Sequence, residues 1–440
     1  MDATTLFLIG LFLLVSCAVI AGEIASRLGA AALVGQLLVG VALGPSLLGG
    51  PLGLSGLSSQ FAPINFLATF LILMLAGLSV TPEQIRATGF SAGLLGTAIF
   101  LVPFLTGAAI VHLLFPGLSW LTGLFVALTI SITALPVLAI MLREFGLVET
   151  KFGSFLLNTS VVNELAAVST FAVLLRIRAG SDSTSVDTLI AILSVAVFLG
   201  TILAIHYLLR TLRQLKVWDR LVARFQANWR SREAWFAVLM VVGLASALYS
   251  AFLGLTFLVG AFYAGLLITP ESAGKRQHRQ ITQTFNIITW GFFIPFFFAY
   301  VGFEMNFTTL GTSLVVIGGF IALAVFAFFS KIFVGSAVTR TLGWSPQESL
   351  CAGFLVSSRG AVELAMAVIL LTDGVFTTQL FTIVAGVGLL TTVFAPIGAR
   401  PFVRAITAER LQQEAEERQA AVHAGMPSPL LRLPEEPGRL

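Results

Sequence analysis

The sequence predicts an all-α polytopic membrane protein of about 13 transmembrane helices, arranged as a six-helix inverted repeat with crossed broken helices. Three observations lead to this fold class. Of the 440 residues, 57% are hydrophobic and only 10% are charged, and the mean hydropathy is +0.97. Apolar runs of roughly 20 residues, the length of a spanning helix, recur along the chain. Glycine and polar positions of the first half return in the second half at one fixed offset.

The composition excludes several other classes of protein. A soluble chain of this length carries roughly 25% charged residues, so this one lacks the polar surface that solubility requires. Long apolar runs differ from the alternating segments of an outer-membrane barrel. The net charge of +4 comes from short basic connections between apolar runs, which argues against a nucleic-acid groove. Cys17 and Cys351 lie in apolar stretches without ligand spacing, so neither a disulfide framework nor a zinc site is expected.

Thirteen apolar runs appear when the chain is cut at polar residues and at Gly or Pro breaks. The first run follows Met1-Asp2, which has no basic residue, so it is interpreted as a span and not as a signal peptide. The second and ninth runs are the shortest. The runs cover residues 5–25, 31–48, 62–80, 89–114, 119–142, 153–176, 187–209, 233–252, 254–269, 283–304, 310–339, 347–372 and 376–399.

The basic residues support this count and orient the chain. If the runs all cross the membrane, 21 of the 25 Lys and Arg residues fall on one side, two on the other and two inside spans. Loops rich in Lys and Arg face the cytoplasm. The expected topology therefore has the N-terminus outside, the C-terminus in the cytoplasm, and a location in the inner (plasma) membrane.

Two regions are expected. Residues 1–404 form the transmembrane domain, and residues 405–440 form a short cytoplasmic tail that is charged and Pro-rich. The tail is expected to be a frayed helix followed by disorder, too small for a nucleotide-binding domain. No cofactor is expected.

An internal repeat relates the two halves. Gly35 and Gly40 in the second run match Gly260 and Gly265 in the ninth, an offset of 225 residues. The same offset relates further positions: Pro45 to Pro270, Gly77 to Gly302 and Thr133 to Ser358. A shift of seven spans reverses the membrane orientation of the second copy, which is the plan of many secondary transporters. The alternative is that Gly and Pro recur by chance in Gly-rich membrane helices.

Two interrupted helices are expected near the membrane midplane. The sequence breaks at 133–136 (Thr-Ala-Leu-Pro) in the fifth run and at 357–360 (Ser-Ser-Arg-Gly) in the twelfth. Unwound backbone at this depth is tolerated beside a cavity or within protein. Crossing broken helices bring helix ends together and are expected to leave backbone carbonyls free for a cation.

Four ionisable residues lie deep inside spans: Glu164, Lys331, Arg359 and Glu363. Each costs roughly 2.5–3.5 kcal/mol at the bilayer centre if it is unpaired, so each requires a partner or a wet cavity. The repeat does not reproduce them, since the offset pairs Glu164 with Leu389 and Arg359 with Ala134.

Glu164 is the best candidate for an ion-binding residue. A carboxylate is a hard oxygen ligand for Na⁺ or K⁺, and removal from water favours its protonated form. Asn163 supplies an amide, Ser160 lies one helical turn earlier, and Thr133 is at the helix break; these three are the candidate additional ligands. The alternatives are an acid that only packs helices, a structural Asn163, and a Ser160 hydroxyl that bonds its own backbone.

The other three charges are interpreted as charge-compensating. Arg359 and Glu363 are spaced i, i+4 and are expected to form an intrahelical ion pair. Lys331 is expected to balance the helix dipoles at the crossing, or else to lose a proton during the cycle.

Five segments give the chain a close resemblance to the monovalent cation:proton antiporters, and in particular to the second cation:proton antiporter family, which includes Kef-type and Na⁺/H⁺ antiporters. The resemblance covers nearly all of residues 5–400. The segments are VGQLLVGVALGPSLLG (34–49), SITALPVLAIMLREFGLVETKFGSFLLNTSVVNELAAV (131–168), IPFFFAYVGFEMNF (294–307), FFSKIFVG (328–335) and SSRGAVELAMAVI (357–369).

The resemblance implies a core from residues 89–176 and 310–399, a separate dimerisation domain, a homodimer and an elevator-like movement of the core. It places the family's ion-carrying pair at Asn163 and Glu164, where Glu replaces the usual Asp. Asn163 favours electroneutral exchange and Lys331, at the family's intramembrane lysine position, favours electrogenic exchange, so the stoichiometry stays open. Kef-type relatives often add a nucleotide-binding domain, which is not expected on this chain.

The expected function is exchange of Na⁺ or K⁺ for protons by alternating access, with both ions competing for Glu164. The protein is expected not to be an enzyme, because the sequence has no HExxH zinc motif and no Asp pair in its spans. One alternative is a Na⁺-coupled organic anion symporter of similar fold. An ion channel is a further alternative, although channels more naturally show repeated filter loops.

Overall fold

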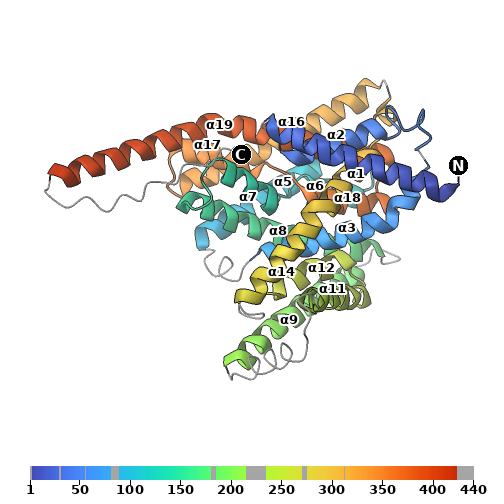
Figure 1. Cartoon of the computed structure of the whole chain (residues 1–440), viewed down its shortest axis with the longest axis horizontal. Coiled ribbons are helices and arrows are strands. Elements are labelled where there is room, and N and C mark those ends of the chain that lie inside the picture. Colours follow the sequence, from blue (N-terminus) through green and yellow to red (C-terminus); the bar gives the residue numbers. More distant parts are fainter. Residues whose placement is uncertain are drawn as a thin grey trace.

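The chain folds into a bundle of helices (Figure 1). The computed structural model describes residues 2–28, 31–54, 56–80, 89–179, 185–214, 234–269, 275–311 and 313–423. Within these ranges every element is helical and there is no strand. The predicted all-α class is therefore confirmed. Predictions about the basic loops at 81–88 and 215–233 and about the last residues of the tail lie outside the described residues.

The helices follow the predicted runs in order. The first half contains α1 (Ala3–Arg27), α2 (Ala32–Leu43), α3 (Ser58–Ser79), α5 (Phe90–Leu114), α6 (Trp120–Thr129), α7 (Leu135–Glu144), α8 (Lys151–Ala179) and α9 (Ser185–Gln214). The second half contains α11 (Ala234–Phe252), α12 (Phe257–Leu267), α14 (Lys275–Ile288), the π-helical turn η1 (Thr289–Phe293), α15 (Ile294–Glu304), the 3₁₀ turn η2 (Phe307–Leu310), α16 (Leu314–Thr341), α17 (Pro346–Val356), α18 (Ala361–Thr372) and α19 (Thr378–His423).

Every predicted run overlaps at least one helix, but the number of membrane spans stays a prediction. Among the described residues, nine helical stretches are long and apolar enough to cross a membrane. Four further apolar helices are shorter, including α2 and α12, the two runs that were also shortest in the sequence.

One boundary differs from the sequence prediction. The tenth run was expected to begin at residue 283, whereas its helix begins at Lys275 with a polar turn that sequence hydropathy alone does not mark. In the tail, for which a helix was expected at the start, α19 continues to His423 and extends past the bundle (Figure 1).

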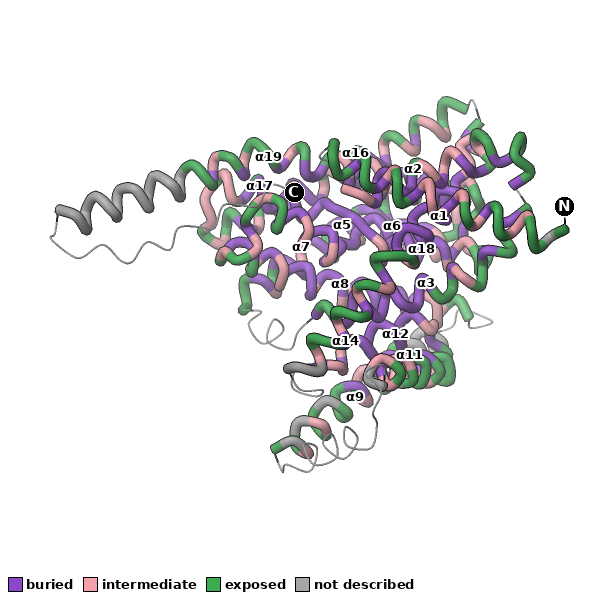
Figure 2. Tube along the Cα trace, in the orientation of Figure 1, coloured by how far each residue is buried: buried purple, intermediate pink, exposed green. Residues whose placement is uncertain are grey.

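The burial pattern is that of a membrane protein with a protein-filled centre. Buried segments gather in the middle of the bundle and exposed ones lie at its rim (Figure 2). Large apolar side chains are prominent among the exposed residues, for example Leu314 at 85% and Phe90 at 84% exposure. Such an apolar rim fits contact with lipid tails, which requires no polar surface.

The internal repeat is present in the packing as well as in the sequence. Gly40 of α2 and Gly302 of α15 cross closely: a Cβ on Gly302 would lie 3.0 Å from the Gly40 Cα. Their repeat partners, Gly265 of α12 and Gly77 of α3, cross in the same way, and a Cβ on Gly265 would lie 3.0 Å from the Gly77 carbonyl carbon. Small residues allow such close approach of membrane helices.

A second pair of contacts obeys the same offset. A Cβ on Gly35 would overlap the backbone of Ala21, and a Cβ on Gly260 would overlap the backbone of Ser246. Residues 21 and 246 are also 225 positions apart. Chance recurrence of glycine does not explain contacts that match on both sides, so the duplication is the better explanation.

We expect Gly40→Ala to destabilise the protein, because the added methyl group would collide with the Ala299 backbone. Overpacking of this kind costs about 1–3 kcal/mol. The measurement is the midpoint of thermal unfolding of the purified protein in detergent. Gly93→Ala in α5 is the matched control, because open space surrounds that position. Equal midpoints for the two variants would contradict the close crossing.

Candidate functional site

The structure buries the four intramembrane charges predicted from the sequence. Glu164, Lys331, Arg359 and Glu363 are each at most 1% exposed. Among the residues that the structure describes, these four are the only buried acidic or basic ones. Because burial of an unpaired charge is costly, the partners of each one reveal its role.

The two broken helices meet at their breaks. The backbone N–H of Ala134, between α6 and α7, is 3.4 Å from the Ser358 carbonyl oxygen, between α17 and α18. The Thr133 hydroxyl donates a hydrogen bond of 2.7 Å to the Val356 carbonyl, the last residue of α17. The predicted crossing of broken helices is therefore confirmed.

Arg359 closes the carbonyl end of α6. Its guanidinium donates to the Thr129 carbonyl at 2.9 Å and to the Ile130 carbonyl. A cation at this end of a helix is favourable, because the partial negative charge of the helix dipole gathers there. The guanidinium also lies 3.5 Å from the Glu363 carboxylate, so the predicted i, i+4 pair is present.

Lys331 reaches the same crossing from α16. Its ammonium donates a hydrogen bond of 2.6 Å to the Thr133 hydroxyl, which in turn donates to Val356. No carboxylate of the described residues lies within 4.0 Å of this ammonium as a salt-bridge partner. The positive charge therefore lies near the carbonyl end of α17, linked to it through one hydroxyl.

These contacts limit one expectation. The crossing was predicted to leave backbone carbonyls free for a cation, but three of them already accept hydrogen bonds from side chains: Thr129 and Ile130 from Arg359, and Val356 from Thr133. Arg359 and the Thr133 hydroxyl satisfy these three carbonyls. The sequence placed these charges near the breaks but did not reveal which acceptors they occupy.

Asn163 holds the unwound segment between α6 and α7. Its side-chain oxygen accepts from the Thr133 backbone N–H at 2.7 Å, and its side-chain nitrogen donates to the Ser131 carbonyl at 3.2 Å. Both ends of the amide are thus used to satisfy backbone groups that a broken helix leaves open. The Thr133 hydroxyl is similarly engaged on both sides.

Glu164 and Ser160 differ from Asn163 and Thr133, whose side chains are hydrogen-bonded, and from Glu363, whose carboxylate is paired with Arg359. Neither carboxylate oxygen of Glu164 has a hydrogen-bond partner among the described residues, and neither does the Ser160 hydroxyl. The two side chains are one helical turn apart on α8, and both are fully buried. Ser160 does not bond its own helix, whereas the preceding Thr159 donates to Phe155. These three unpartnered oxygens form the candidate ion-binding site.

An aliphatic cluster lies beside this part of α8. Val161 packs with Val80 at the end of α3 and with Leu135 at the start of α7, and partly buried neighbours complete the cluster. These neighbours are Leu157, Leu165 and Leu266. Val161 is three residues from Glu164, so apolar side chains adjoin the acid on one flank.

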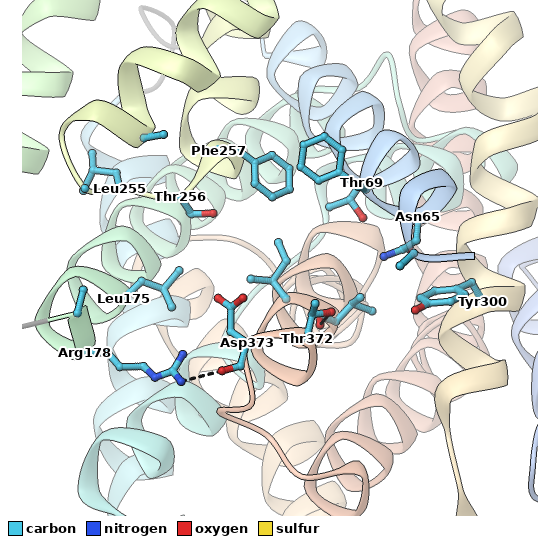
Figure 3. Close-up of a pocket in the computed structure, with 17 residues that line it drawn as sticks. Asn65, Thr69, Leu175, Arg178, Leu255, Thr256, Phe257, Tyr300, Thr372 and Asp373 are labelled. Atoms are coloured by element: carbon cyan, nitrogen blue, oxygen red, sulfur yellow. Dashed lines mark hydrogen bonds between the residues drawn. The ribbon is translucent and has the colours of Figure 1, made fainter. Parts of the chain in front are cut away.

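Two cavities approach the site from opposite ends of α8. One, of about 670 Å³, reaches Leu175 and Arg178 near the C-terminus of α8 (Figure 3). The other, of about 500 Å³, reaches Glu144 and Phe145, just before the turn that leads into the N-terminus of α8. Glu164 lines neither cavity.

The sequence analysis did not single out the polar residues of the larger cavity. Asn65 and Thr69 of α3, Arg178 of α8 and Asp373 after α18 line it. The sequence does contain a signal for this polar lining. Asn65 and Thr69 are polar residues spaced i, i+4 within an apolar run, so they lie on one face of a helix.

Comparison with known proteins agrees with this fold. The family described as "Sodium/hydrogen exchanger, transmembrane" matches residues 11–405. Among relatives, the probable Na⁺/H⁺ antiporter GerT of Bacillus cereus is 26% identical over 377 residues, covering 86% of this chain and 94% of the relative. The Na⁺/H⁺-K⁺ antiporter GerN of the same organism is 25% identical over 382 residues, covering 86% and 91%.

Solved structures show the same fold. The sodium proton antiporter MjNhaP1 from Methanocaldococcus jannaschii at pH 8 superposes with a TM-score of 0.67 at 15% identity, over 90% of this chain and 96% of that chain. The resemblance to cation:proton antiporters is thus confirmed, while the Kef-type affiliation stays a prediction. Since the family match spans most of the chain, this protein belongs to the sodium/hydrogen exchanger family, a family of membrane antiporters and not of enzymes.

Proposed function

We propose that the protein exchanges Na⁺ or K⁺ for protons by alternating access, and that cation and proton compete for Glu164. The observation that carries the proposal is the contrast among the four buried charges. Arg359 and Glu363 pair with each other and Lys331 bonds Thr133, whereas the Glu164 carboxylate has no partner.

A buried carboxylate without a partner is stable in two forms. Either a proton neutralises it, or a cation lies against its oxygens. Both forms cannot exist together on one carboxylate, so binding of one ion releases the other. Competition for this one carboxylate therefore couples the flux of the cation to the opposite flux of protons.

Ser160 is the proposed neutral ligand beside Glu164, because its oxygen is also unpartnered. Asn163 and Thr133 are proposed not to contact the ion themselves. They fix the unwound backbone near the site through the hydrogen bonds described above. Lys331, Arg359 and Glu363 are proposed to compensate charge at the crossing. In this assignment, the substrate ion is held by oxygens of α8 and not by the carbonyls of the crossing.

The two cavities support alternating access. They approach opposite ends of α8 and Glu164 lines neither, so neither leads directly to the acid in this conformation. Exchange therefore requires a movement that connects Glu164 to one cavity at a time. We propose that the core helices α5–α8 and α16–α19 move against the remaining helices.

The choice of cation follows from the relatives. GerT is named as a probable Na⁺/H⁺ antiporter, and GerN as a Na⁺/H⁺-K⁺ antiporter. We propose Na⁺ or K⁺ as the substrate on this basis. The homodimer, the inner (plasma) membrane location and the cytoplasmic C-terminus are proposed from the family resemblance and from the distribution of basic residues.

We expect Glu164→Gln to abolish exchange and to leave the protein folded, since an amide neither carries a proton nor neutralises a cation. The assay uses proteoliposomes that contain a pH-sensitive dye, with Na⁺ or K⁺ added outside. Glu149→Gln is the matched control: that acid is exposed and precedes α8. Exchange by Glu164→Gln at the wild-type rate would refute the proposal. Glu164→Asp is expected to retain exchange with a changed apparent affinity.

Competition predicts a specific pH dependence. Acidification on the cation side is expected to raise the apparent KM for Na⁺ and to leave the maximal rate unchanged. At low pH, where most sites carry a proton, each tenfold rise in proton concentration raises KM by up to about tenfold by mass action. Initial rates measured over a grid of pH and Na⁺ concentration test this. A maximal rate that falls while KM stays constant would show that the two ions do not share a site.

Asn163→Ala is expected to lower the thermal unfolding midpoint, because it leaves the Thr133 N–H and the Ser131 carbonyl without their side-chain partner. Each unsatisfied buried group costs about 1–3 kcal/mol. Asn158→Ala on the same helix is the control. It is half-buried, and a substitution away from such contacts changes stability by about 0.5 kcal/mol or less. A midpoint for Asn163→Ala equal to that of the control would argue that the amide serves only as an ion ligand.

A further inference from the structure

The larger cavity contains polar groups that the exchange site does not use. Figure 3 shows the 17 residues around its volume of about 670 Å³, with Asn65 and Thr69 on α3 facing Thr372 and Asp373 at the end of α18. Phe66 and Phe257, with ring centroids 4.5 Å apart, supply aromatic rings to its lining. The cavity therefore combines an apolar wall with a small set of convergent polar groups, which is the usual composition of a ligand site.

Two of these groups are buried and unsatisfied. Asn65 is 7% exposed and Thr69 is 1% exposed, and the Asn65 side-chain oxygen and the Thr69 hydroxyl have no hydrogen-bond partner among the described residues. The Thr69 hydroxyl and the Asn65 amide point into the cavity (Figure 3). A half-turn of the amide exchanges its nitrogen and oxygen, so either atom can face the cavity. Unsatisfied buried oxygens of this kind require a ligand or water.

An acid lies across the cavity from them. Asp373 follows the last residue of α18, and its side chain is exposed. The Arg178 guanidinium donates a hydrogen bond of 2.7 Å to the Asp373 backbone carbonyl, while the carboxylate points away from the guanidinium (Figure 3). No salt bridge within 4.0 Å joins the two side chains. Arg178 thus fixes the turn and leaves the carboxylate available.

We propose that this cavity is a second cation-binding site, in which the Asp373 carboxylate and the side-chain oxygens of Asn65 and Thr69 hold a monovalent cation before it reaches Glu164. The inference rests on the proposed antiport, because it assigns the site to the transported ion.

The chemistry of the cavity favours a partly hydrated cation. The acceptors are one carboxylate, one amide and one hydroxyl, the hard oxygen ligands that alkali cations prefer. A water molecule occupies about 30 Å³ in the liquid, so a cation and several waters fit in the available volume. A single carboxylate and a partial hydration shell give weak binding, and a site on a transport route must also release its ion.

This site is separate from Glu164. Leu175 and Arg178 line the cavity and lie 11 and 14 residues beyond Glu164 on α8. At the rise of a helix, these separations are roughly 16–21 Å. The site therefore serves one side of the membrane.

The first test compares exchange from the two sides of the membrane. Asp373→Asn is expected to raise the apparent KM for Na⁺ about fivefold or more in either right-side-out or everted vesicles, but not in both. Thr69→Val, which removes only the oxygen, is expected to raise KM about two- to fivefold in the same preparation. Maximal rates at saturating Na⁺ are expected to stay within about twofold of wild type, because Glu164 is intact.

Matched controls separate a bound ion from general surface charge. Asp2→Asn removes an exposed acid that caps the first turn of α1, away from the cavity. Thr106→Val removes an exposed hydroxyl that bonds its own helix. Both are expected to leave KM unchanged. If Asp373→Asn matched Asp2→Asn, or if Thr69→Val had no effect while Asp373→Asn did, the proposed coordination site would be refuted.

A second test removes the exchange site from the measurement. In a Glu164→Gln background, Na⁺ is expected still to raise the thermal unfolding midpoint relative to choline at equal ionic strength, because the cavity still binds the ion. Adding Asp373→Asn is expected to abolish this shift. Absence of a Na⁺-dependent shift in Glu164→Gln would overturn the second site. The proposed antiport is judged separately, since it fails only if Glu164→Gln still exchanges ions.

Discussion

The structure depends on the contact between two helix breaks inside the membrane. Four helix ends meet there with backbone groups that no lipid can satisfy. Side chains satisfy several of them: Arg359 bonds the end of α6, Thr133 bonds the end of α17, and Asn163 bonds the unwound segment between α6 and α7. Lys331 adds a second positive charge through Thr133. The crossing is therefore stabilised by fixed groups of the protein, and the transported ion does not have to complete it.

Much of this arrangement could be predicted from the sequence because membrane burial is so restrictive. Charged residues are costly in apolar runs, so Glu164, Lys331, Arg359 and Glu363 were conspicuous, and all four are buried. The repeat could be recognised in the sequence because close helix crossings require glycine. Gly40 packs against Gly302, and at the equivalent crossing Gly265 packs against Gly77. In both cases, a strong physical constraint left few residue types that could occupy the position.

The sequence did not reveal which oxygens are already used. Ser160, Asn163 and Thr133 all have polar, uncharged side chains. The side chains of Asn163 and Thr133 are hydrogen-bonded, whereas the Ser160 hydroxyl has no partner among the described residues. That difference depends on the path of the unwound segment between α6 and α7, which is set by tertiary contacts with α8 and α17. The polar lining of the larger cavity was missed for the same reason, because Thr69 and Asp373 come from helices far apart in the chain. Spacing along one helix cannot predict such pairs.

Departure from the repeat leaves Glu164 as the unpaired acid among the four buried charges that the structure describes. The position equivalent to Asn163 is Gly388, and the position equivalent to Glu164 is Leu389. The second half thus has no carboxylate at the equivalent position. Glu363 lies beside it instead: a Cβ on Gly388 would lie 3.2 Å from the Glu363 carboxylate oxygen. Glu363 is paired with Arg359, so it is balanced without a proton or a substrate ion. Under the proposed function, the duplication supplies two crossed broken helices. Because the unpaired acid is present in the first repeat and absent from the equivalent position of the second, only the first repeat binds the ion at the crossing.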